Sequence, residues 1–530
     1  MNRLFEESES RMQPPVVGPG RRTAVLTVMC LALAVVVGML ASLLVAAPGM
    51  ARDLAATESE LQWVMNAYGV TFAGLLLAGG ALGDRYGRKG VLLTGLAVFG
   101  LASGAVLLVD DVALVILLRG AAGVGAALVM PMTLSVITAV YPPEGRGRAV
   151  GIWSGVSFGS ALLAVLLAGG LLEAYSWRSV FAVNAGLAAV ALVAAAVLAP
   201  PSRAAGAAPL DAVGALLSLT GIGAVVFGIV EGPERGWAHG AVLAGFAVGA
   251  AALAAFVRWE LRAPYPLLDL RVFRLRGVSA GSLVITAETL AMFGFFFLGL
   301  QYLQEVLGYS PLRAGLALVA MAVGAMVFSP VAPALAKRYG MAVVIGLGMA
   351  LIAAGLLILA AVVDGSGIRG FLVATAVLGA GVAFAATPAT EAIVAALPPA
   401  KQGVASALND LTRELGGVLG IAVLGSIFNA TYRGEVGRAA EELPAGVPEG
   451  ASGTARDSLA GALRVADGVG GARGAEFAGA ARDAFASGMS GALLGGLTVV
   501  ALGGGAAVAL LRRGGSGQRS VSWKSPFSTG

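Results

Sequence analysis

The sequence is poor in the residues on which most enzymes and soluble proteins depend. Its 530 residues include one cysteine, Cys30, and one histidine, His239. A single cysteine excludes an internal disulfide and a cysteine-based zinc site, and a single histidine argues against a histidine metal cluster or a Ser/His/Asp triad. Charged residues make up 12% of the chain, about half the usual fraction. A chain with so little charge cannot cover a water-facing surface.

Catalytic and nucleotide-binding motifs are also missing. The sequence has no P-loop, and no nucleophile elbow or HExxH motif in a suitable context. No segment between the apolar stretches is long enough to form a separate enzyme domain. The basic residues flank apolar stretches, which leaves nucleic-acid binding without support. We therefore expect a protein that is not an enzyme, with no catalytic residue, no bound metal, no cofactor and no nucleic-acid partner.

Long apolar runs are what the sequence has in abundance. Hydrophobic residues make up 58% of the chain, apart from its 78 glycines. Fourteen stretches nearly free of charge, from Thr23–Ala51 to Ala484–Leu511, each have about 20 residues or more, enough for a helix to cross a lipid bilayer. Unbroken apolar runs favour helices over a barrel, whose strands alternate. The sequence predicts an all-α polytopic membrane protein with 14 transmembrane helices.

The basic residues predict the orientation. With fourteen spans both termini lie on one side, and the tails and loops of that side hold 22 of the 35 Lys and Arg residues. The short loops of the other side hold five, and only Arg119 and Arg413 lie within spans. This asymmetry follows the positive-inside rule, so both termini are expected in the cytoplasm and the protein in the cytoplasmic membrane. The long outer segment, about 430–483, is rich in Gly and Ala, and we expect a mobile or weakly helical loop.

A short repeat suggests two related halves. The trio Arg85-Tyr86-Gly87 follows the second span, and Arg338-Tyr339-Gly340 follows the tenth span at the same membrane face. If spans seven and eight are an insertion, each trio ends the second helix of a six-helix half. Parallel repeats of six helices occur in some secondary transporters.

The segment Gly80–Lys89 resembles the signature loop of the major facilitator superfamily. Its small residues let helices approach closely, and its charged residues can form a gating network at the inner face; the alternative is a plain positive-inside turn. The expected gating residues are Gly80, Gly83, Asp84, Arg85, Gly87, Arg88 and Lys89.

The count of six, two and six helices resembles the fourteen-helix drug:proton antiporter branch of that superfamily. Further similar segments are Leu118–Ala127, Ser176–Phe181, Glu231–Trp237, Leu307–Gly315 and Gly403–Gly417. The resemblance implies the major facilitator fold: two six-helix halves plus two inserted linker helices. The expected boundaries are a cytoplasmic tail (1–22), the first half (23–202), the linker helices (203–262), the second half with the outer loop (263–511) and a cytoplasmic tail (512–530).

Three positions depart from that branch. Members carry an Asp early in the first helix, where this chain has Met39 or Leu40. The motif of the fourth helix has Gln where Ala122 stands, and that of the fifth has Gly-Pro where Ala164-Val165 stands. The departures weaken the assignment of antiport over other coupling.

Charges within the spans are candidate functional groups, because they are costly in lipid. Glu288 lies near the middle of the ninth span and is the first candidate for the proton-binding group. The structural alternative is a protonated Glu bonded to Thr286 or Thr289.

A second group of charges lies in the thirteenth span. Asp410, Arg413 and Glu414 stand at i, i+3 and i+4 and so share one helix face. Arg413 can neutralise one acid and leave the other to bind a proton. The alternatives are a self-paired structural triad or a latch of the inner gate.

Two further charges complete the candidates. Arg119 is alone in the fourth span and needs an acid or a carbonyl as partner; the family resemblance implies a role in proton transfer, and the alternative is a structural pair. Glu391 lies near the inner end of the twelfth span and is either a weaker coupling candidate or an interfacial residue.

These features favour a secondary transporter that exports hydrophobic drugs or metabolites in exchange for protons and works as a monomer, its energy coming from the proton gradient. One alternative is a proton-coupled uptake symporter or a uniporter. An alternative of another class is a membrane sensor or scaffold that does not transport.

Overall fold

In the computed structural model the protein is all-helical over the residues that the structure describes, which are 19–202, 209–363, 367–397, 402–441 and 450–512. These ranges contain no strand. The helices of the first part are α2 (Pro19–Asp53), α3 (Glu58–Tyr86), α4 (Arg88–Ala105), α5 (Val112–Val140), α6 (Pro143–Ala174) and α7 (Arg178–Leu198). They are followed by α8 (Ala212–Arg235) and α9 (Gly240–Glu260).

The second part has more helices because some spans are broken. Its elements are α10 (Arg276–Gln301), α11 (Pro311–Ala317), α12 (Val319–Phe328), α13 (Ala332–Tyr339), α14 (Met341–Val362), α15 (Gly367–Ala396), α16 (Gln402–Glu441), α17 (Ala451–Asp457), α18 (Leu459–Val469) and α19 (Gly471–Arg512). Helix α10 continues into a π-helical turn at Tyr302–Val306, and 3₁₀ turns follow α4 at Val106–Leu108 and precede α10 at Leu270–Arg274.

Thirteen helices in the described residues are long and apolar enough to cross a membrane. Helix α6 adds a fourteenth, because it runs unbroken for 32 residues and its Gly159–Ala174 part is apolar. The prediction of an all-helical polytopic protein is confirmed.

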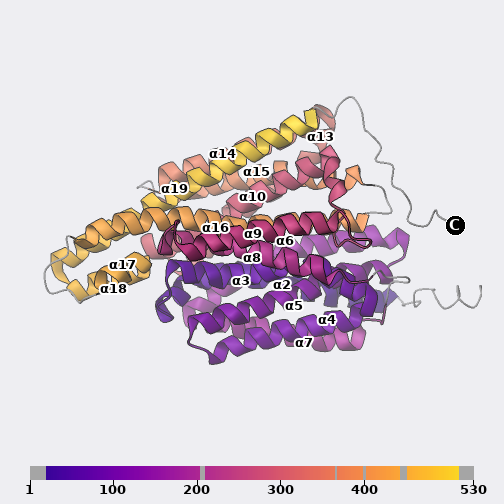
Figure 1. Ribbon diagram of the computed structural model, residues 1–530, viewed down its shortest axis with the longest axis horizontal. Helices are drawn as coiled ribbons and strands as arrows, with labels where there is room; N and C mark the ends of the chain where they lie inside the picture. The colour runs from indigo at the N-terminus through magenta and orange to yellow at the C-terminus, as the bar shows by residue number, and fades with distance from the viewer. Residues whose placement is uncertain (1–18, 203–208, 364–366, 398–401, 442–449, 513–530) are drawn as a thin grey trace, which may run out of the picture.

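The helices pack in two groups with a pair between them (Figure 1). Helices α2–α7 pack on one another, and α10–α16 pack with α19. Helices α8 and α9 pack together, and α8 lies against both α3 and α16, which belong to different groups. This is the expected arrangement of two six-helix halves and two linker helices.

The repeated Arg-Tyr-Gly trios form equivalent corners. Gly87 connects α3 to α4 with a φ of 108°, and Gly340 connects α13 to α14 with a φ of 89°. A side chain is strained at such positive φ values, whereas glycine is not. The sequence repeat is therefore also a structural repeat, and the end of the bundle that holds both turns is called the corner end here.

The opposite end carries a helical lobe, in the segment for which we expected a mobile or weakly helical loop. Helices α16 and α19 have 40 and 42 residues, roughly twice the number that spans a bilayer. Their extensions and the short helices α17 and α18 form the end lobe (residues 432–441 and 450–483), seen at the left of Figure 1.

Apolar packing explains why the described part of this segment is helical and not loop-like. Its Ala-rich sequence favours helix, and one face of each helix is apolar. Val436, Leu459 and Phe477 are buried in the lobe, and the Tyr432 hydroxyl donates to the carbonyl of Ala455 at 2.9 Å. Arg433 Nη1 also lies 3.4 Å from Asp457 Oδ1.

Several close contacts join the two halves near this lobe end. Asn429 Nδ2 of α16 lies 3.3 Å from Ser59 Oγ of α3. Gln304 Nε2 donates to the carbonyl of Val45 at 3.1 Å, and α11 packs on α6. The halves are thus held together at the lobe end.

Candidate functional site

Glu288 lies in the middle of α10 and is 1% exposed. Its Oε2 atom makes no hydrogen bond to the described residues. The two neighbouring threonines, which were the alternative partners, donate elsewhere: Thr286 to the carbonyl of Thr412 at 3.3 Å, and Thr289 to that of Ile285 at 2.7 Å. The alternative bond from Glu288 to Thr286 or Thr289 is therefore not made at Oε2, and a buried carboxyl oxygen without a partner is unfavourable.

Glycines bring α16 against the Glu288 region of α10. A Cβ atom at Gly416 would lie 2.0 Å from Thr289 Oγ1 and 2.6 Å from the Thr286 carbonyl oxygen, and one at Gly420 would lie 2.3 Å from the Leu290 carbonyl oxygen. Only glycine allows this approach. The small-residue pair on α16 therefore packs within the second half and does not lie between the halves.

Arg413 connects the charged triad of α16 to Glu288. Arg413 interacts electrostatically with Glu288, Asp410 and Glu414, so one cation serves three acids. The three triad side chains are half-buried, unlike Glu288. The sequence predicted two separate sets of charges, and the structure brings them together into one cluster, called the acid cluster below.

Asn409 links the acid cluster to α15. Its Oδ1 accepts a hydrogen bond from the Thr390 hydroxyl at 2.9 Å, and its Nδ2 lies 3.5 Å from Asp410 Oδ1. Glu391, the next residue of α15, is exposed. Its exposure fits the interfacial interpretation better than a role in coupling.

Arg119 is fully buried between α5 and α3. Its Nε donates to the carbonyl of Val64 at 3.0 Å, and its guanidinium stacks 4.5 Å from the centroid of the Tyr68 ring. The predicted partner is therefore a carbonyl and a ring, while Nη1 and Nη2 make no hydrogen bond to the described residues. Tyr68 also interacts electrostatically with Glu414, which places Arg119 near the acid cluster through one side chain.

The signature loop ties four helices together at the corner end. Asp84 Oδ1 lies 3.0 Å from Arg88 Nη2, and Arg88 Nη1 donates to the Ser135 carbonyl at 3.2 Å. Lys89 Nζ donates to the Ala196 carbonyl at 2.6 Å, and Arg85 lies over the ring of Tyr86. The charged residues thus connect α3 and α4 to α5 and α7.

The two glycines of this loop on α3 differ in how closely they approach α5. A Cβ atom at Gly83 would lie 2.0 Å from Met132 Sδ, and one at Gly80 would lie 3.8 Å from Pro131 Cβ. Gly83 leaves room for the end of the Met132 side chain of α5 against α3, whereas the space at Gly80 is ordinary.

Sequence reasoning missed a polar group near the lobe end. Glu58, Gln62 and Asn66 of α3 are all buried. Gln301 ends α10, and Glu305 lies in the π-helical turn that follows it. A search for charges within the spans could not find the amides, because they are uncharged. It also missed Glu58 and Glu305, because they stand at the margins of their spans. The spacing of Glu58, Gln62 and Asn66, four residues apart on one helix face, was the available signal.

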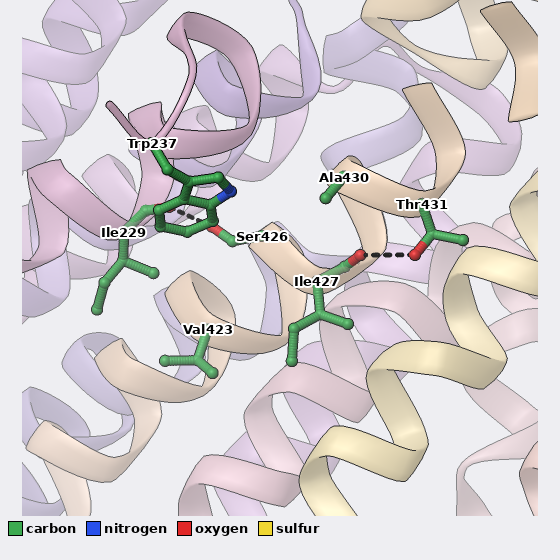
Figure 2. A pocket seen from close by; sticks show the side chains of 7 residues that line it. All are labelled: Ile229, Trp237, Val423, Ser426, Ile427, Ala430 and Thr431. Carbon is green, nitrogen blue, oxygen red and sulfur yellow. Dashed lines mark hydrogen bonds between the residues drawn. The ribbon is translucent and has the colours of Figure 1, made fainter. Parts of the chain in front are cut away.

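An apolar pocket of about 420 Å³ lies apart from the acid cluster (Figure 2). Ile229 and Trp237 line it on one side, and residues between Val423 and Thr431 of α16 line it on the other. The Ser426 hydroxyl donates to the Ile229 carbonyl and holds α8 on α16. Because Val423 is nine residues beyond Glu414, this pocket is about 14 Å along α16 from the acids.

The comparisons with known proteins agree with the fold. The family model described as Major Facilitator Superfamily matches residues 29–421. The multidrug efflux pump LfrA of Mycolicibacterium smegmatis is 33% identical over 84% of this chain and 87% of its own. The cephamycin export protein CmcT of Amycolatopsis lactamdurans is 36% identical over 79% and 87%. The crystal structure of a bacterial homolog of the lysosomal transporter Spinster has the same fold, with a TM-score of 0.67 at 15% identity over 94% of this chain and 99% of that one.

Proposed function

Because the chain belongs to the Major Facilitator Superfamily, a family of membrane transporters, we propose that it exports hydrophobic drugs or metabolites across the cytoplasmic membrane in exchange for protons. The names of its relatives support export: one is a multidrug efflux pump and another exports an antibiotic. The observation that carries the proposal is the acid cluster, in which Arg413 of α16 interacts electrostatically with Glu288 of α10 and with Asp410 and Glu414 of its own helix.

The charges of the acid cluster suit proton exchange. Three acids around one arginine leave an excess of negative charge when all three are ionised. Binding a proton relieves that excess, and so does binding a cationic substrate, so each would displace the other. The mutual exclusion of proton and substrate is the coupling that antiport requires.

The close contacts at the lobe end support a state open toward the corner end. Asn429 meets Ser59 at the lobe end, while the triad in the middle of the bundle is half-buried. In the proposed cycle the halves rock about the acid cluster and open each end in turn. The Asp84–Arg88 pair would hold the signature loop during this movement.

The corner end is proposed to face the cytoplasm, together with both termini, because its loops and tails hold most of the basic residues. Proton influx then supplies about 2.3 kcal/mol per charge for each 100 mV, besides the pH gradient. No cofactor is needed for this cycle, and one chain contains both halves, so a monomer suffices.

One departure favours a second candidate, proton-coupled uptake or uniport. Met39 is fully buried and Leu40 is half-buried in α2, where the antiporter branch has an acid. The acid cluster lies in the other half and would have to bind the proton without an acid in α2. A single proton site of this kind is compatible with symport as well as with antiport.

Everted membrane vesicles that contain the overproduced protein test the proposal. The vesicles are energised, a pH-sensitive dye reports their gradient, and hydrophobic cationic and neutral compounds are added in turn. We expect substrate-induced proton release with the native protein and its loss with Glu288→Gln. Proton movement in the opposite direction would support uptake. No movement with any compound, in vesicles that hold their gradient, would contradict antiport.

A further inference from the structure

Helices α3 and α16 form a long antiparallel seam between the two halves. At the lobe end Asn429 meets Ser59. One or two turns deeper, Gln62 lies against Gly425, where an added Cβ would be 2.7 Å from the Gln62 Cδ atom. Near the middle, a Cβ at Gly69 would be 2.5 Å from Val418 Cγ2. The seam runs from the lobe end toward the acid cluster.

The α3 side of this seam carries buried polar groups without partners. Gln62 is 0% exposed and Asn66 is 1% exposed, and neither the oxygen nor the nitrogen of either amide hydrogen-bonds to the described residues. Glu58, one turn further toward the lobe end, is also buried, and its Oε1 is likewise without a partner. Since Glu58, Gln62 and Asn66 stand four residues apart, their unpartnered atoms follow one another along one helix face.

Such a row is suited to water. Buried polar atoms that lack protein partners are normally satisfied by ordered water, which needs two to four polar neighbours. Four amide atoms and a carboxyl oxygen provide these neighbours over eight residues, about 12 Å of helix. A chain of hydrogen-bonded waters between them would reach from Glu58 to Asn66.

Beyond the lobe end of the row, Glu305 connects Glu58 to a cavity. Glu58 interacts electrostatically with Glu305. Glu305, with an unpartnered Oε1, lines a cavity of about 510 Å³ together with Arg52 and Arg464.

Charged groups surround the two acids from every element packed there. Arg52 of α2 and Arg464 of α18 act on Glu305, and Asp467 of α18 also lines the cavity. The Tyr432 hydroxyl, Arg433 and Asp457 lie beyond the pair, in the end lobe. Both arginines act on Glu305, the acid of the pair that lines the cavity.

The corner end of the row is closed. The Gly69–Val418 contact lies between Asn66 and Glu414, which is one turn of α16 beyond Val418. A path open over its whole length would let protons leak across the membrane without substrate. The apolar contact prevents this in the present state, and a movement of α3 against α16 would open it.

We propose that Glu305, Glu58, Gln62 and Asn66 form the proton inlet of the transporter, a water-filled file that leads from the lobe end to Glu414 and is interrupted by Gly69 and Val418. This inference rests on the proposed proton-driven export. A proton leaves water in the cavity, binds the carboxylate of Glu305 or Glu58, passes along the file to the carboxylate of Glu414, and returns to water at the corner end. No other bond changes.

Two assays on the full-length protein in vesicles test the inlet. The first measures substrate-induced proton release, as above. The second measures exchange of labelled for unlabelled substrate without a pH gradient, which requires alternating access but no net proton transfer. We expect Glu58→Gln and Asn66→Leu to lower the proton-coupled rate at least tenfold and to leave exchange within twofold of the native rate.

Matched controls come from buried residues outside the file. Glu260→Gln replaces a buried carboxyl that accepts from the Leu268 amide, and Asn184→Leu replaces a buried amide that donates to the Val180 carbonyl. Both controls should keep the proton-coupled rate within twofold of the native rate. Asn66→Ser, whose hydroxyl can still bind water, should retain more than half of it.

Three outcomes would overturn the inference. A native coupled rate in Glu58→Gln would show that protons take another route. Parallel loss of coupling and exchange, in variants that reach the membrane at native levels, would show a structural role only. Absence of proton movement in the native protein would refute the proposed function, and the proposed inlet would fall with it. The other two outcomes would refute only the inlet and leave the proposed function standing.

Discussion

Asn429 and Ser59, 370 positions apart in the chain, hydrogen-bond to each other across the seam between the two halves. Both side chains are buried, and Ser59 Oγ also donates to the carbonyl of Val230 at 3.4 Å. Three helices, α3, α8 and α16, thus meet at one hydroxyl group. We regard this point as the lock of the lobe end.

Replacing Asn429 should loosen that lock. Asn429→Leu removes the amide donor and leaves the Ser59 hydroxyl with one hydrogen bond fewer. We expect this loss to destabilise the closed conformation of the lobe end by about 1–3 kcal/mol. The reporter is a protein that carries Cys30→Ser and Gln62→Cys, so that its one thiol is at position 62. A membrane-impermeant maleimide added from the lobe side should label this thiol at least threefold faster when Asn429→Leu is also present. Thr431→Val is the control, since the Thr431 hydroxyl donates within its own helix to Ile427. Equal labelling rates would contradict the assignment of the lock.

The acid cluster predicts a difference between two glutamates. Glu414→Gln removes an acid beside Arg413, whereas Glu391→Gln changes an exposed side chain. We expect Glu414→Gln to lower substrate-induced proton release at least tenfold, and Glu391→Gln to leave it within twofold. Dye quenching in everted vesicles measures both. Equal effects of the two substitutions would contradict the interpretation of Glu391 as interfacial.

Arg119 should matter more to transport than to stability. Its guanidinium stacks on Tyr68, and a lysine ammonium cannot reproduce that planar contact. Arg119→Lys should therefore lower stability by about 1–2 kcal/mol. Arg119→Leu removes a buried cation whose two terminal nitrogens make no hydrogen bond to the described residues, so it should be no less stable than the lysine variant.

Transport should follow the opposite order. We expect Arg119→Leu to lose at least tenfold in proton-coupled rate, and Arg119→Lys to retain more of it. Thermal unfolding of the purified variants gives the stabilities, and the vesicle assay gives the rates. Arg313→Lys, a conservative exchange in the short helix α11, is the control for both. A large loss of stability in Arg119→Leu would show that the buried cation is structural.

Two glycines of α16 should respond in opposite ways to alanine. A Cβ at Gly416 would lie 2.0 Å from Thr289 Oγ1, so Gly416→Ala must separate α10 from α16 and should destabilise by about 1–3 kcal/mol. A Cβ at Gly434 meets nothing within 4 Å, so Gly434→Ala should stabilise by up to about 1 kcal/mol through helix propensity. Thermal unfolding in detergent would show a lower midpoint for the first and an unchanged or higher midpoint for the second; the reverse order would contradict the packing.

Much of the candidate site could be predicted because charge is rare in the spans. Glu288, Asp410, Arg413 and Glu414 stand out in apolar surroundings, where an unneeded charge would be selected against. The corner at Gly87 could also be predicted, since its motif repeats at Gly340.

The end lobe and the lobe-end polar file could not be predicted in the same way. The lobe segment has a mixed, Ala-rich composition that fits a loop as well as a helix, and only the burial of residues such as Phe477 distinguishes the two. Gln62 and Asn66 are uncharged, so a search for charges passes over them. Their burial without partners depends on α16, which is more than 300 residues away in the chain.

The sequence by itself determined that this protein lies in a membrane, how many helices cross it and which acids lie within it. These properties are local: they follow from the free energy of placing each stretch of side chains in lipid, whatever its neighbours. The tertiary structure alone decided that Glu288 shares Arg413 with two other acids, and that one end of the seam is closed by Asn429 and Ser59. Such pairings depend on the packing of helices that are distant in the chain, which hydropathy and charge patterns do not specify.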